Sequence, residues 1–199
     1  MEVNRIVETV LENIFIEIES SGRHVHVTKE QAQILFGHSL TPERPLSQPG
    51  QWVAKERVTV VGPKGEFRNV AVLGPERKEA QVEISLTDGR TLGVQPPIRP
   101  SGDTSDSPGA LLIGSRGEVA LPEGVIVAQR HIHITPGDAS HFGVRDKQLV
   151  NLQTYTERPL IFQDVLVRVS PDFATRVHLD IDEANACGYR TGDLGRILS

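Results

Sequence analysis

The sequence predicts a mainly β protein of two small β-barrel domains, related by an internal duplication and capped by short α-helices, with an N-terminal amphipathic helix. Three observations support this fold class. Valine outnumbers alanine 22 to 11, and β-branched side chains favour pleated strands over helix interiors. Short alternating runs are separated by Gly and Pro turns, as is typical of barrels and sandwiches. An Arg-His-x-His segment also occurs twice, which suggests the duplication.

The N-terminal 37 residues predict a helix, a strand and a second helix in that order. Apolar side chains recur at helical spacing over residues 1–14, with glutamates on the opposite face. Alternation then predicts a strand over residues 15–22. Thr28, followed by Gln31, resembles a capping box and predicts a short helix that ends at Gly37.

Short strands separated by tight turns are predicted through the middle of the chain. The alternating runs cover residues 57–61, 69–73 and 81–86. The turn formers between or after them are Gly62-Pro63-Lys64-Gly65, Gly74-Pro75 and Asp88-Gly89. Residues 95–110 contain too many Pro, Gly and Ser residues for a regular element, so we expect a long loop there.

The two halves of the chain match each other in two places. Residues 130–135 copy residues 23–28 with only Val-to-Ile changes, and Thr135-Pro136 again predicts the start of a short helix. Residues 67–94 also align with residues 162–189 at a constant offset of 95, with five of 28 positions identical. Because both matches occur in the same order, we expect a duplicated unit with a pseudo-twofold relation.

Each His-x-His segment offers half of a metal site. Residues i and i+2 of a strand point to the same face, so two imidazoles can share one ion. The offset of 95 superposes Glu83 on His178 and supplies a third ligand in both halves. The predicted sites are therefore His24, His26 and Glu83 for one zinc, and His131, His133 and His178 for a second. Three protein ligands leave a fourth position open, as in catalytic zinc sites.

Other polar residues have simpler interpretations. Arg77 follows a predicted strand, six residues before Glu83, and is either a phosphate-binding arginine or a solvated loop charge. His38 and His141 are expected at the surface, and Cys187 is expected to be a small buried hydrophobic residue. Gly62-Pro63-Lys64-Gly65 lacks the Gly-Lys-Ser/Thr of a phosphate loop and is expected to be a plain turn.

Composition excludes several functional classes. The 199 residues carry a net charge of −5 and only nine aromatic side chains, which argues against a nucleic-acid partner. The single cysteine excludes an internal disulfide and fits a reducing compartment. Apolar runs fall short of the ~20 residues of a membrane span, and the N-terminus does not resemble a signal peptide. We therefore expect a cytoplasmic protein with no membrane partner.

Several motifs together resemble the PduL-type phosphotransacylases, or phosphate propanoyltransferases, from about residue 15 to the C-terminus. They include both Arg-His-x-His copies and the segments Leu46–Gln51, Val61–Gly65, Val72–Arg77, Gln81–Glu83, Ser101–Asp103, Ser107–Gly109 and Val125–His133. The resemblance implies the reaction acyl-CoA + phosphate ⇌ acyl phosphate + CoA at a two-zinc site between two barrels. It implies the same six ligands, with Arg77 as the phosphate-binding residue.

Ligand charge suggests which zinc would serve which substrate. The zinc held by the three histidines would take the CoA sulfur, because three neutral ligands leave it more electrophilic, and the other would hold phosphate together with Arg77. The expected domains are a helix over 1–14, a strand over 15–22 that completes the C-terminal barrel, a first barrel over 23–129 and a second over 130–199. Two readings of residues 1–14 stay open: a targeting peptide for a bacterial microcompartment, with shell or core proteins as partners, or a structural cap or homo-oligomer contact.

Two rival functions fit the same residues. A binuclear metallohydrolase would also use two zincs with open positions, but it needs a general base near the bridging water, and none stands out beside Glu83. A non-catalytic metal-binding module would have both sites filled by protein ligands alone.

Overall fold

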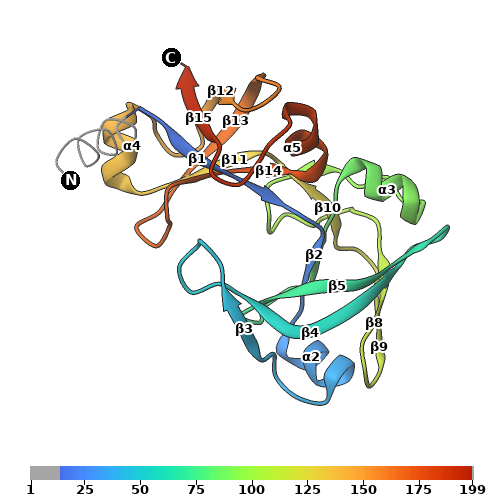
Figure 1. Cartoon of the computed structure of the whole chain (residues 1–199). Coiled ribbons are helices and arrows are strands. Elements are labelled where there is room, and N and C mark those ends of the chain that lie inside the picture. The colour runs from blue at the N-terminus through green and yellow to red at the C-terminus, as the bar shows by residue number, and fades with distance from the viewer. Residues whose placement is uncertain (1–13, 199) are drawn as a thin grey trace. The chain divides into compact units, whose positions relative to one another are not determined.

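The computed structural model describes residues 14–198 and divides into two compact units (Figure 1). Unit 1 contains residues 14–21 and 130–198 of the described chain, and unit 2 contains residues 22–129. The expected mainly β architecture with short helices is confirmed in both. The amphipathic helix predicted over residues 1–14 lies outside the described residues except for Ile14.

Unit 1 is a closed six-stranded barrel with two short helices. Its elements are β1 (Ile16–Ser21), β11 (His131–Ile134), α4 (Pro136–Phe142), β12 (Leu149–Tyr155), β13 (Ile161–Val169), β14 (Arg176–Asp180), α5 (Ile181–Cys187) and β15 (Leu194–Leu198). The barrel order is β1-β14-β11-β13-β12-β15, and antiparallel pairing of β1 with β15 closes it. Closure removes the exposed strand edges that an open sheet would have.

Unit 2 contains a nine-stranded sheet that curves into a half-barrel. Its elements are β2 (His24–His26), α2 (Lys29–Phe36), β3 (Pro42–Pro45), β4 (Trp52–Val61), β5 (Glu66–Gly74), β6 (Gln81–Glu83), α3 (Leu86–Leu92), β7 (Ile98–Arg99), β8 (Ala110–Ile113), β9 (Glu118–Leu121) and β10 (Val125–Ala128). The strand order is β7-β10-β6-β2-β5-β4-β8-β9, with β3 on β4. The two end strands, β7 and β9, do not pair with each other, so this sheet is less closed than the barrel that the sequence predicts.

Each unit has its own hydrophobic core. The core of unit 1 includes Ile18, Ile132, Leu152, Val167 and Leu179. The core of unit 2 includes Val25, Leu35, Val72, Leu92 and Leu112. Each of these cores contains residues of one unit only, and the burial of their apolar surface stabilises that unit.

The strand that directly precedes each His-x-His strand belongs to the other unit. β1 directly precedes β2 in the chain, yet β1 pairs in parallel with β14 of unit 1. β10 directly precedes β11, yet β10 pairs in parallel with β6 of unit 2. The chain thus exchanges one strand in each direction, and β1 completes the barrel of unit 1.

The internal duplication extends to backbone details. At the offset of 95, the N-caps Ser85 and Asp180 correspond, as do the left-handed C-caps Gly93 and Gly188. Asn69 and Asp164, also 95 apart, both adopt positive φ, of 58° and 54°. Asn and Asp are the non-glycine residues that tolerate this region best, so both copies of the repeat have a suitable residue at the same left-handed position.

Helix ends are partly as predicted. Thr28 and Gln31 form the predicted capping box of α2, and Thr135 caps α4 with Pro136 in its first turn. The helices α3 and α5 were not predicted, and Asp88-Gly89 is not a hairpin turn but lies inside α3. The predicted strand 81–86 ends at Glu83, because Ser85 accepts the backbone N–H of Asp88 and starts the helix.

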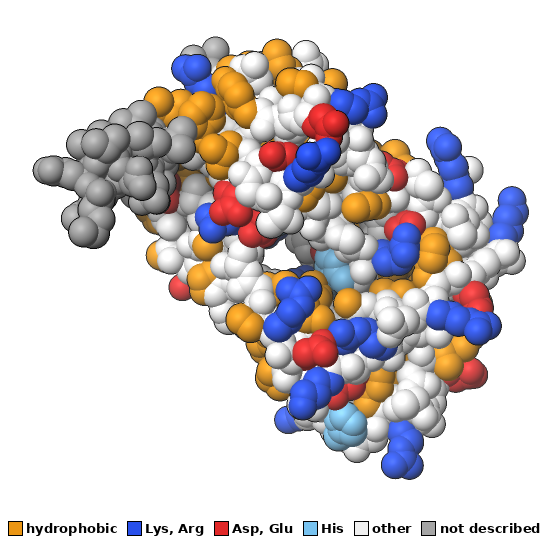
Figure 2. All heavy atoms as spheres, viewed as in Figure 1, with side chains coloured by type: hydrophobic (Ala, Val, Ile, Leu, Met, Phe, Trp, Pro, Cys, Tyr) orange, Lys and Arg blue, Asp and Glu red, His pale blue; other side chains and the backbone are white. Residues whose placement is uncertain are grey.

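The loop and surface expectations are also largely met. Residues 95–109 lie in a loop that is interrupted by the two-residue β7, and Ala110, the last residue of the predicted loop, begins β8. His38 and His141 are exposed, and Cys187 is fully buried. In the face shown in Figure 2, lysine and arginine side chains are interspersed with acidic ones. None of the helices in residues 14–198 combines the length and the apolar character needed to cross a bilayer.

The placement of β1 in the barrel core can be tested by truncating one side chain. Ile18 is fully buried, so Ile18→Ala should lower the free energy of unfolding by about 2–5 kcal/mol through lost burial and a residual cavity. Ile161 is 57% exposed, and Ile161→Ala should change it by less than about 0.5 kcal/mol. Chemical denaturation measures both. Equal effects of the two substitutions would contradict the burial of β1.

Candidate metal centres

The register between β2 and β6 assembles the first triad. The two strands are antiparallel, with His24 directly opposite Glu83 and His26 opposite Gln81. Directly opposed side chains lie on one face of a sheet, and His26 shares that face with His24 because it is two residues along. One ligand atom from each of His24, His26 and Glu83 lies within 4.8 Å of the other two. All three side chains are buried.

Hydrogen bonds orient His24 and Glu83 towards each other. The Nδ1 of His24 is 2.9 Å from the carbonyl oxygen of Gly22, and its Nε2 is 3.5 Å from Oε2 of Glu83. The other carboxylate oxygen, Oε1, accepts from the Ser101 hydroxyl at 2.7 Å and from the Gln81 amide. Ligands in metal sites are oriented by outer contacts of this kind.

The electrostatics of this triad suit a cation. Burial alone would raise the pKa of Glu83, but the adjacent His24 imidazole and the Ser101 hydrogen bond hold it below its usual range. Burial opposes protonation of His24, yet the Glu83 carboxylate raises the pKa of His24 above its ordinary value. Burial and the charges of His24 and Arg77 lower the pKa of His26 to about 2, so this imidazole is neutral. A neutral imidazole is the form that ligates metals.

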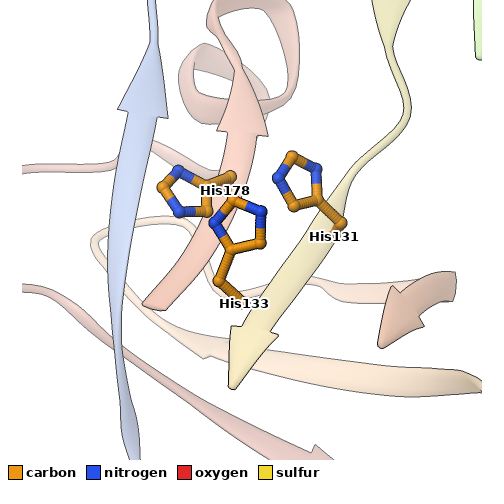
Figure 3. Close-up of side chains that lie close together, drawn as sticks. All are labelled: His131, His133 and His178. Atoms are coloured by element: carbon orange, nitrogen blue, oxygen red, sulfur yellow. The ribbon is translucent and has the colours of Figure 1, made fainter. Parts of the chain in front are cut away.

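The second triad repeats this geometry in unit 1. β11 and β14 are antiparallel, with His131 directly opposite His178 and His133 opposite Arg176. Figure 3 shows the three imidazoles turned towards one another, two from β11 and one from β14. Ring centroids are 4.6 Å apart for His131 and His133, and 4.8 Å for His133 and His178. Their candidate ligand atoms also lie within 4.8 Å of one another.

The surroundings of the second triad differ from those of the first. Glu19 on β1 is directly opposite His178, and its Oε2 is 3.8 Å from the Nδ1 of His178. Arg176 forms ion pairs with Glu17 and Glu19, at 3.1 and 3.4 Å. The His133 ring stacks on Phe173 with centroids 4.0 Å apart. His178 therefore has a charged outer contact from strand β1.

The donor sets fit zinc. Among the described residues, the buried Nδ1 of His26 has no hydrogen-bond partner, and a buried polar nitrogen in that state is costly. Imidazole and carboxylate donors in a set of three are those of catalytic zinc sites. Other first-row divalent ions bind the same donors. The sequence-predicted residues of each set are thus brought together within their own unit, and each set can hold one ion.

Arg77 lies close to the first triad. It belongs to the turn between β5 and β6, and its backbone N–H donates to the carbonyl of Val27 at 2.9 Å, just beyond β2. Its positive charge acts to lower the pKa of both His24 and His26. Gly74, at the start of this turn, has no room for a Cβ because the Trp52 ring covers it. The packing of Gly74 against Trp52 positions the start of this turn, and the charge of Arg77 in the turn acts on both histidines of the triad.

Two arginines, to which the sequence analysis gave no role, link each His-x-His strand to a neighbouring helix, and we call these links the arginine braces. Arg23 donates to both carboxylate oxygens of Asp88, at 2.7 and 3.0 Å, and lies over the Phe67 ring. Arg130 donates to Glu183 at 2.7 Å. Each arginine directly precedes a His-x-His strand, and each carboxylate belongs to the helix that follows the third ligand. The offset of 95 between Asp88 and Glu183 was the signal that could have revealed these braces.

Comparisons with known proteins all point to one family. A sequence model of the phosphate propanoyltransferase family matches residues 17–190. A phosphate propanoyltransferase of Listeria monocytogenes is 54% identical over 185 residues, which cover 92% of this chain and 87% of the relative. One from Clostridioides difficile is 52% identical over 98% of this chain and 97% of its own length. One from Thermotoga maritima is 54% identical over 89% and 86%.

The matched range 17–190 of the family model spans both units and includes the positions of all six triad residues. The resemblance expected from the sequence motifs is confirmed at high identity. The chain belongs to the phosphate propanoyltransferase family.

Proposed function

We propose that this protein catalyses the reaction acyl-CoA + phosphate ⇌ acyl phosphate + CoA on a short-chain acyl group. The observation that carries the proposal is the repeated triad, built by the same strand register in both units of a chain that belongs to the phosphate propanoyltransferase family. Nothing in the comparisons favours the metallohydrolase alternative.

This reaction makes three demands on a protein. The thioester carbonyl must be polarised, the departing thiolate stabilised, and phosphate held in a fixed orientation at low entropic cost. Zinc bound by each triad would supply a Lewis acid and a site for sulfur or phosphate oxygen. Because Arg77 offers a planar fork of N–H donors, it suits bidentate binding of phosphate. In this scheme no covalent enzyme intermediate is needed.

The ligand charges suggest which triad serves which substrate. His131, His133 and His178 form a neutral set that leaves the full charge of an ion available, and we assign it to the CoA sulfur. The set of His24, His26 and Glu83 contributes one negative charge and lies beside Arg77, and we assign it to phosphate. The basis for this assignment is the charge of Arg77, which acts on His24 and His26.

The reaction itself is tested by release of CoA thiol from propanoyl-CoA, with and without phosphate. We expect thiol release that depends on phosphate and is matched by formation of propanoyl phosphate. Release at the same rate without phosphate would instead indicate a hydrolase. Running acetyl-, propanoyl- and butanoyl-CoA in parallel gives the preferred chain length.

Removal of one ligand tests the metal stoichiometry. Glu83→Ala should reduce the zinc content of the purified protein from two ions per chain to one, because two imidazoles alone are a weak site. Glu79→Ala removes an exposed carboxylate four residues away and should retain both ions. Elemental analysis on protein of known concentration decides. Two ions in Glu83→Ala would defeat this ligand assignment.

Steady-state kinetics tests the role of Arg77. Arg77→Ala should raise the KM for phosphate about 10- to 100-fold, the loss expected for a charge-assisted hydrogen bond, with little change in the KM for acyl-CoA. Arg68, whose side chain is 82% exposed, gives the matched control Arg68→Ala, which should behave as the wild type. An unchanged KM for phosphate in Arg77→Ala would remove Arg77 from the phosphate site.

A further inference from the structure

Gln81 occupies an unusual position beside the first triad. It is two residues before Glu83 on β6 and directly opposite His26 on β2, and it is 2% exposed. A primary amide has two donors and one acceptor oxygen, and burying them is costly unless each finds a partner. The partners of this amide therefore indicate what it does.

The Gln81 amide is satisfied on both sides. Its NH₂ group donates to Oε1 of Glu83 and to the Ser101 hydroxyl, the latter at 3.0 Å. Its carbonyl oxygen accepts the backbone N–H of Gly102 at 2.7 Å. The Gly102 N–H can only donate, so it fixes which end of the amide is oxygen and which end faces the carboxylate.

Ser101 closes a three-membered network around the same oxygen. Its hydroxyl accepts from Gln81 and donates to Oε1 of Glu83 at 2.7 Å. Oε1 therefore receives two hydrogen bonds, whereas Oε2 faces the Nε2 of His24 at 3.5 Å. The two oxygens of the Glu83 carboxylate thus have different partners.

We infer that Gln81 is a positioning residue that, together with Ser101, occupies Oε1 of Glu83 and so leaves Oε2 alone as the metal ligand. This inference rests on the proposed function of the triad. Gln81 also ties the loop at Ser101–Gly102 to the metal ligand, since one amide holds both. Loop position and carboxylate orientation are then coupled through a single side chain.

Unit 1 provides an internal contrast. The position equivalent to Gln81 is Arg176, which is opposite His133 and forms ion pairs with Glu17 and Glu19. The third ligand there is an imidazole, His178, with no second oxygen to occupy. The amide is present in the unit where the third ligand is a carboxylate.

The test measures zinc affinity at the first triad alone. The parent is the full chain with His131→Ala and His133→Ala, so that only the first triad binds, and zinc is titrated against a chromophoric chelator. Adding Gln81→Met, which preserves volume but removes all three hydrogen bonds, should weaken zinc binding about 10- to 100-fold, as loss of outer contacts typically does. Cobalt bound to the Gln81→Met variant should show weaker visible absorption than cobalt bound to the parent, because a bidentate carboxylate raises the coordination number of the ion.

Two further variants make the outcome decisive. Gln33→Met makes the same substitution at an exposed helix position of unit 2 and should leave zinc affinity unchanged. Ser101→Ala removes one of the two donors to Oε1 without altering β6 and should weaken zinc binding in the same direction, which decides the matter if Gln81→Met does not fold.

The possible failures are distinguishable. A parent that binds no zinc would overturn the proposed metal site and this inference with it. If the parent binds zinc and both Gln81→Met and Ser101→Ala bind it with the same affinity as the parent, only the role of Gln81 is overturned.

Discussion

The antiparallel pairing of each His-x-His strand with one short neighbouring strand fixes which side chains can meet. In both pairs, a valine of the second strand is opposite the residue between the two histidines: Val82 opposite Val25, and Val177 opposite Ile132. These four residues are fully buried, so a shift of one residue in register would put apolar side chains on the polar face and imidazoles in the core. The hydrophobic core thereby sets the geometry of the polar triads, and the arginine braces at Asp88 and Glu183 hold the adjoining helices to the same strands.

The exchange of strands gives the two triads different neighbours from one repeated plan. β1 brings Glu19 beside His178, whereas β10 brings Ile126 beside Glu83. A carboxylate next to an imidazole ligand raises its basicity, and an apolar neighbour leaves Glu83 to be oriented by Gln81 and Ser101. The duplicated strands therefore form two chemically distinct groups of side chains, one of three imidazoles and one that includes a carboxylate.

The sequence predicted the residues of both triads, because these depend on the two-residue period of strands and on the internal repeat. The pairs His24/His26 and His131/His133 follow from the two-residue period, and Glu83 and His178 follow from the offset of 95. Helices α3 and α5 were missed because Asp88-Gly89 is also a common turn pair, and each of these seven-residue helices buries few apolar side chains. The half-barrel of unit 2 depends on which end strands pair, and that is a long-range property. The hydrogen bonds between Gln81 and Ser101 join residues that are 20 apart in the sequence, and no spacing pattern predicts this contact.

The most direct measurement is a crystal structure of the zinc-loaded protein with anomalous data collected on both sides of the zinc absorption edge. We expect two zinc peaks per chain, one bonded to His24, His26 and a single oxygen of Glu83, the other bonded to His131, His133 and His178. A peak at only one triad, or zinc bound by other residues, would overturn this assignment of the ligands.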